Sequence, residues 1–109
     1  MKKGVEMMIL LEMVKKNLII EHDEDDELIK SFIDSAVDYA EKYQHRVKGF
    51  YAVHPMSATT RQGVVFLACY YYESRDGSTG GFFNDSTNAA KQIMTTVDFL
   101  FRLDREWKV

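Results

Sequence analysis

The segment that most constrains the fold is residues 58–75, which read as a helix with apolar side chains on every side. A helix that is apolar all round must be buried all round. We therefore expect it to be the central core helix, or a helix shared with a neighbouring subunit. Gly63 lies in its interior, where glycine is about 1 kcal/mol less favourable than alanine. This predicts a close backbone approach at Gly63. One face of the helix carries Val64, Val65, Ala68, Tyr71 and Tyr72, and Phe66 and Tyr70 point almost the opposite way.

Three further helices are predicted over residues 8–19, 24–47 and 88–107, because apolar residues recur there at helical spacing. The first stripe is Leu10, Leu11, Val14 and Leu18. The second is Ile29, Phe32, Ile33, Ala36, Tyr39, Ala40, Tyr43 and Val47, opposite a polar face of Glu27, Lys30, Asp34, Asp38, Glu41 and His45 that we expect to meet solvent. The third is Ala90, Ile93, Met94, Val97, Leu100 and Phe101.

The ends of these helices carry recognisable signals. Gly49 is expected to stop the second helix, and Ser57 after Pro55 is expected to start the next one. Ser86 or Thr87 can cap the last helix. Residues 49–56 are expected to form an extended connector arm or a short hairpin. The sequence therefore predicts an all-α fold, a small bundle of about four helices, in a single domain over residues 1–109.

Length and composition exclude several classes of protein. A chain of 109 residues fits one domain, and its net charge of −3 argues against a nucleic-acid-binding protein with a basic surface. The single cysteine, Cys69, excludes an internal disulfide and fits a reducing compartment. The Lys2-Lys3 start resembles a signal peptide, but Glu6 and Glu12 interrupt the apolar run. No window approaches a membrane span. We expect a cytosolic protein.

The acidic segment is the first candidate site. Glu21, Asp23, Glu24, Asp25, Asp26 and Glu27 run into the second helix, with His22 among them. A calcium loop needs alternating oxygen ligands and a turn glycine, and no glycine occurs between Gly4 and Gly49. We interpret the acids as the start of a helix, where Asp23 or Asp25 caps and the others face the positive end of the helix dipole. An acidic surface used in assembly is the alternative.

Motifs that carry catalysis are missing from the chain. The three histidines, His22, His45 and His54, have no metal-ligand spacing. Cys69 lies on an apolar helix and is expected to be a packed thiol. The glycine-rich stretch over residues 77–81 has neither the lysine nor the spacing of a phosphate-binding loop. The sequence predicts no catalytic residues, no cofactor and no metal, and the protein is expected not to be an enzyme.

Aromatic residues, at 13%, exceed what one small core requires. Several large apolar side chains lie off the core stripes or in the loop at residues 76–85. We expect these to contact a neighbouring subunit or partner protein. They are Phe66, Tyr70, Phe82, Phe83, Phe99, Leu103 and Trp107.

Two stretches resemble the head–tail connector proteins of tailed bacteriophages and prophages. The first is LEMVKKNLII followed by EHDEDDELIKSFIDSAVDYAEKY, in which Asp25-Asp26 and Leu28-Ile29 match the family's acidic pair and the apolar pair after it. The second is RQGVVFLACYYYESRDG, which resembles the family's apolar helix with its Tyr-Glu-x-Arg ending. The resemblance covers about residues 10–76. The chain departs from the pattern at residues 47–50, where the family has a Gly-Arg pair, and residues 50–56 match little.

The resemblance implies a mechanical function. Such proteins assemble head to tail as a ring, expected to match the twelve-fold symmetry of the portal protein beneath which it sits. The ring extends the DNA channel and docks a further head-completion or tail protein. DNA passes through without tight specific binding, and no membrane is involved. The implied location is the head–tail junction of the virion, with assembly in the bacterial cytoplasm.

An alternative from the residues themselves is a small helical DNA-binding or regulatory protein. Residues 58–75 would then be its recognition helix, with Arg61 and Gln62 reading the bases. That function requires an exposed polar face on this helix.

Overall fold

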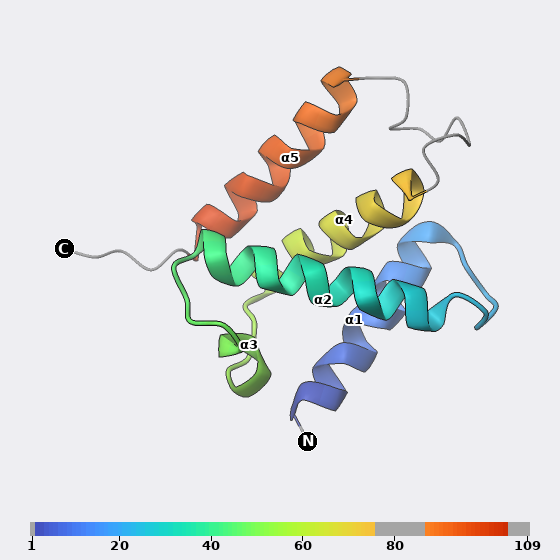
Figure 1. The fold of residues 1–109 in the computed structure, drawn as a ribbon, viewed down its shortest axis with the longest axis horizontal. Coiled ribbons are helices and arrows are strands. Elements are labelled where there is room, and N and C mark those ends of the chain that lie inside the picture. Colours follow the sequence, from blue (N-terminus) through green and yellow to red (C-terminus); the bar gives the residue numbers. More distant parts are fainter. Residues whose placement is uncertain (1, 76–86, 105–109) are drawn as a thin grey trace.

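The fold is a bundle of helices arranged around one central helix (Figure 1). The computed structural model describes residues 2–75 and 87–104, without the side chains of residues 2–4 and 87–90. These ranges contain helices α1 (Lys2–Leu18), α2 (Asp26–Tyr43), α3 (Phe50–Val53), α4 (Ala58–Ser74) and α5 (Thr87–Arg102), and no strand. The predicted all-α bundle is confirmed.

Helix α4 is the central helix, as its sequence predicts. It packs against α1, α2 and α5, and every described residue from Thr59 to Ser74 is at least partly buried. The predicted close approach at Gly63 is also confirmed, because a β-carbon there would lie 2.5 Å from Cε1 of Phe101. The glycine therefore lets α5 press its largest buried side chain against the backbone of α4.

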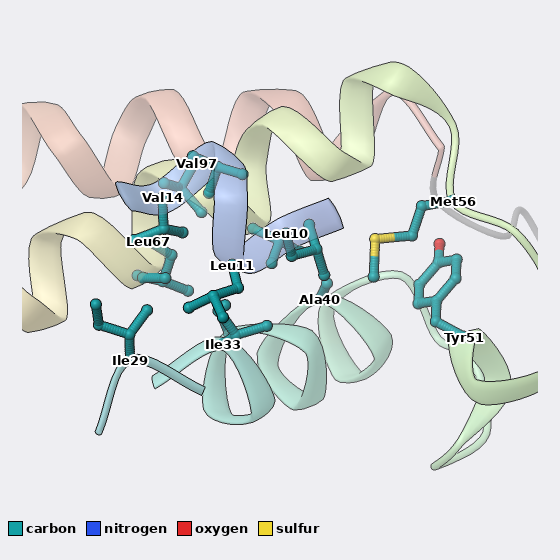
Figure 2. Close-up of a cluster of buried hydrophobic side chains, with 14 of the residues drawn as sticks. Leu10, Leu11, Val14, Ile29, Ile33, Ala40, Tyr51, Met56, Leu67 and Val97 are labelled. Atoms are coloured by element: carbon teal, nitrogen blue, oxygen red, sulfur yellow. The ribbon is translucent and has the colours of Figure 1, made fainter. Parts of the chain in front are cut away.

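The core is formed by one face from each of the surrounding helices (Figure 2). Most of the predicted apolar stripe residues lie in or against this core, but Val47 is exposed, Leu100 is only partly buried and lies outside the core cluster, and the side chain of Ala90 lies outside the described part. Burial of the core supplies the main driving force for folding. Its buried residues are Leu10, Leu11, Val14, Ile29, Ile33, Ala36, Ala40, Tyr51, Met56, Val64, Val65, Leu67, Ala68, Val97 and Phe101.

Val47 is exposed because α2 ends earlier than predicted, at Tyr43. His45 has a φ of +62°, and the amides of His45 and Arg46 donate to the carbonyls of Lys42 and Glu41. This pattern is a Schellman motif, which closes a helix with one residue in the left-handed conformation. The predicted stop at Gly49 is therefore wrong by a few residues.

The segment between α2 and α4 contains the short helix α3, where the sequence predicted an extended arm or a hairpin. The reason is Glu41, whose carboxylate accepts hydrogen bonds from the backbone amides of Gly49, at 3.0 Å, and Tyr51, at 2.9 Å. Glu41 was assigned to the solvent-facing side of α2, but its exposed fraction is only 3%. Its carboxylate instead holds the first turn of α3 against α2.

The helix ends were predicted in part. Ser57 caps α4 as expected, because its hydroxyl accepts the amide of Thr60 at 3.1 Å. Asp25 occupies the N-cap position of α2, but its carboxylate binds the Tyr72 hydroxyl and makes no side-chain cap. Helix α1 begins at Lys2, earlier than predicted, and α5 ends at Arg102, before the predicted end at Trp107. The predicted caps of α5 lie outside the described side chains.

The end of α1 is strained, which leads to a prediction. Ile19 has a φ of +58° in a second Schellman motif, and its side chain is 83% exposed. A β-branched residue in this conformation costs about 1–2 kcal/mol. Ile19→Gly removes that strain, although glycine loses more chain entropy on folding. We expect a gain of about 0.5–1 kcal/mol in the free energy of unfolding, measured by urea denaturation.

Ile20→Gly is the matched control for this change. The Ile20 side chain packs against the core, so its removal is expected to destabilise the protein. Equal losses in the two variants would show that the conformation of Ile19 carries no strain.

Candidate assembly surface

The outer face of α5 and the turn that follows it expose two large apolar side chains, four residues apart. Phe99 is 52% exposed and Leu103 is 58% exposed, while Val97 and Phe101 on the opposite side are fully buried. Arg102 lies between the exposed pair in sequence and is also exposed. A surface of this kind, apolar with a charged edge, is typical of a protein–protein contact. We call Phe99, Arg102 and Leu103 the α5 face.

The other predicted contact residues lie in different places. Phe66 and Tyr70 are half-buried and pack against the core from α4, so they add little to the exposed surface. Phe82, Phe83 and Trp107 lie outside the described residues. Among the predicted contact residues that the structure describes, Phe99 and Leu103 are therefore the ones that are free to meet a partner.

A second exposed apolar group, on α1, was not predicted. Val5, Met8 and Ile9 lie on one side of the helix at positions i, i+3 and i+4, and Met8 is 67% exposed. The exposed Glu12 continues the same stripe. The helical spacing of Val5, Met8 and Ile9 is visible in the sequence, but a helix beginning at Met8 leaves Val5 out. We call Val5, Met8, Ile9 and Glu12 the α1 face.

The acidic segment joins helices. The ammonium of Lys15 on α1 lies 2.8 Å from a carboxylate oxygen of Asp23 and 2.8 Å from one of Asp26. The hydrogen bonds to Asp23 and Asp26 raise the pKa of Lys15, and the hydrogen bond from Lys15 lowers the pKa of Asp23. Asp25 binds Tyr72 on α4, and this hydrogen bond raises the pKa of the Tyr72 hydroxyl. The segment thus connects α1, α2 and α4, a structural role that differs from the predicted side-chain cap, while Asp26 and Glu27 lie in the first turn of α2 as expected.

Neither a metal-binding cluster nor an activated thiol is found in the described part of the chain. Among residues 2–75 and 87–104, no three histidine, cysteine, aspartate or glutamate side chains come together as a metal site would require. Cys69 is half-buried, and desolvation raises the pKa of its thiol to about 11, which keeps it protonated and unreactive at neutral pH.

A surface groove of about 350 Å³ lies between α1, α2 and α3. Its apolar wall includes Leu10, Ile33 and Met56. Two of its carboxylates are occupied within the protein, because Glu6 pairs with Arg61 and Glu41 binds the α3 backbone. These acids serve the fold and do not form a reactive pair.

Helix α4 lacks the polar surface that a recognition helix needs. The guanidinium of Arg61 makes two hydrogen bonds to the Glu6 carboxylate, at 2.9 and 3.0 Å, and these bonds raise its pKa. Gln62 is partly buried. Arg61 is thus used to hold α1 against α4, and the described structure gives no support to the DNA-binding alternative.

Comparison with protein families decides between a phage connector and a DNA-binding protein. The family model of phage gp6-like head-tail connector proteins matches residues 8–98. The chain belongs to this family. The connector is therefore a structural component of a phage virion that assembles with other head or tail proteins. The match extends from α1 to within α5; it includes Met8, Ile9 and Glu12 of the α1 face and ends just before the α5 face.

Two further findings complete the comparison. No curated protein and no solved structure matches the connector significantly. None of the described helices is long and apolar enough to cross a membrane.

Proposed function

We propose that this connector, acting as one domain over residues 1–109, forms a ring beneath the portal protein. The ring extends the DNA channel and docks the next head-completion or tail protein, with the portal's twelve-fold symmetry. The observation that carries this proposal is the exposed apolar α5 face on a member of the connector family. Apolar side chains that are left uncovered on a small protein are expected to be covered in the assembled state.

The charge of the chain supports a role as a channel. The net charge is −3, and a surface that does not bind phosphates tightly allows DNA to move past it. We propose Phe99 and Leu103 as contacts to neighbouring subunits. Phe66, Tyr70, Phe82, Phe83 and Trp107 stay predictions of the same kind.

The test is the joining of heads to tails. DNA-filled heads from a phage that lacks this gene are mixed with tails and purified connector, and infectious particles are counted. We expect the natural protein to restore infectivity, and Phe99→Asp and Leu103→Asp to lower it by about tenfold or more each, because each removes an apolar anchor. Circular dichroism should show unchanged helicity in both variants.

Val47→Asp is the matched control, because it places the same charge at an exposed apolar residue away from α5. It is expected to restore infectivity like the natural protein. If the natural protein fails to restore joining, or binds neither heads nor tails, the proposed function is wrong.

A further inference from the structure

We propose that the α5 face of one subunit binds the α1 face of a second copy of this chain. The proposal rests on the ring assembly described above and adds which two surfaces meet. Its starting point is the position of the two helices: α4 packs against both α1 and α5 and lies between them (Figure 1). Each molecule therefore carries two different exposed apolar faces on opposite sides of its central helix.

This placement fits head-to-tail assembly. A heterologous contact joins two different surfaces. A growing assembly therefore keeps one free surface of each kind at its two ends, and further subunits can be added until the ring closes. A symmetric dimer would instead join two copies of one face and stop. Two apolar faces on α1 and α5 give each subunit both halves of a repeating contact.

The charges beside the two faces are opposite. Glu12 lies at the end of the α1 face, with the exposed Lys16 one turn beyond it, and Arg102 belongs to the α5 face. Glu12 and Arg102 are both exposed, and neither forms an ion pair with another residue in the described part of the chain. Opposite charges favour Glu12 beside Arg102 in a contact between the α1 face and the α5 face. A contact of α1 with α1, or of α5 with α5, offers no such pair.

The apolar side chains of the two faces are also suited to one another. The α1 face offers Val5, Met8 and Ile9, which together with Phe99 and Leu103 give side chains of the kind that fill the centre of a protein–protein interface. Methionine adapts its shape readily and makes favourable contacts with aromatic rings. Met8 against Phe99 is therefore the pair we expect near the centre.

Cross-linking tests the pairing directly. Met8→Cys and Phe99→Cys are made separately in a Cys69→Ala protein and treated with a short bismaleimide. The protein concentration is raised to about 1 mM, because a contact with millimolar affinity is then about half occupied. We expect dimers when the two variants are mixed, and few when each is treated alone. One protein carrying both changes should give a ladder beyond the dimer.

Val47→Cys mixed with Phe99→Cys is the control for random collision and is expected to give no product above background. Cross-linking of Met8→Cys to itself at the level of the mixture would overturn the proposal. A mixture that gives no dimer at any concentration would also overturn it.

Charge reversal gives a second measurement on the same contact. Glu12→Arg and Arg102→Glu should each weaken self-association about tenfold in sedimentation, and the combined variant should recover part of that loss. Unchanged association in both single variants would contradict the pairing.

The outcomes separate this inference from the proposed function. Restored head–tail joining without the Met8–Phe99 cross-link would refute the pairing alone. A cross-linked ladder from a protein that does not restore joining would refute the function alone.

Discussion

Glu41→Ala is expected to lower the free energy of unfolding by about 3 kcal/mol. The carboxylate is buried, and its two oxygens accept the backbone amides of Gly49 and Tyr51. Hydrogen bonds to a charged group contribute about 1.5–3 kcal/mol each, and a buried amide left without an acceptor is costly. The variant also no longer has to bury a charged carboxylate, and this gain offsets part of the lost hydrogen-bond energy. Urea denaturation followed by circular dichroism measures the loss.

Two variants make this expectation specific. Glu27→Ala removes an exposed glutamate from the same helix and is expected to change stability by less than about 0.5 kcal/mol. Glu41→Gln keeps the shape but turns an amide donor toward a backbone donor, so an intermediate loss is expected. Hydrogen exchange at the Tyr51 amide should accelerate in both Glu41 variants. If Glu41→Ala is as mild as Glu27→Ala, the carboxylate does not hold α3 in place.

Gly63→Ala is expected to destabilise the protein by about 2 kcal/mol, although alanine is the better helix former. The new methyl carbon would lie 2.5 Å from Cε1 and 2.9 Å from Cδ1 of Phe101. Overpacking of this kind costs about 1–3 kcal/mol and occasionally more, against about 1 kcal/mol gained in helix propensity. The ring of Phe101 cannot move away easily, because it is fully buried and contacts Tyr39 and Tyr43.

A double-mutant cycle isolates this contact. Phe101→Leu removes the ring atoms nearest to Gly63, so Gly63→Ala should be much less damaging in that background. The expected coupling is about 1–2 kcal/mol in favour of the combined variant, measured by urea denaturation. Additive losses would show that the methyl group is accommodated without a clash.

The regular part of the fold could be predicted from the sequence because it depends on periodicity. The all-apolar pattern of residues 58–75 identifies the central helix, and Gly63 within it indicates the close contact. The pattern could not reveal the burial of Glu41. Its position on the polar side of α2 is correct for the helix alone, and only the return of the chain through α3 covers it. A helix of four residues is too short to leave a periodic signal.

The exposure of the predicted contact residues could be anticipated from the sequence only in part. Phe99 and Leu103 lie off the core stripe of their helix, and this displacement is a signal that a sequence contains. Phe66 and Tyr70 gave the same signal but are half-buried, because α4 has neighbours on several sides. Prediction of the α1 face requires the residue at which α1 begins, and the sequence pattern placed that residue too late in the chain. Helix boundaries are fixed by tertiary contacts such as the pairing of Glu6 with Arg61, which the sequence does not show.

Ion pairs bind helix α1 to the rest of the molecule near both of its ends. Glu6 pairs with Arg61, and Lys15 pairs with Asp23 and Asp26. Exchange of α1 between subunits, a common route to oligomers by domain swapping, would require all of these pairs to break while the apolar side of α1 leaves the core. Subunits that dock through preformed surfaces avoid that barrier. Growth of the proposed ring should therefore be limited by the encounter of folded subunits, and its rate should rise with protein concentration.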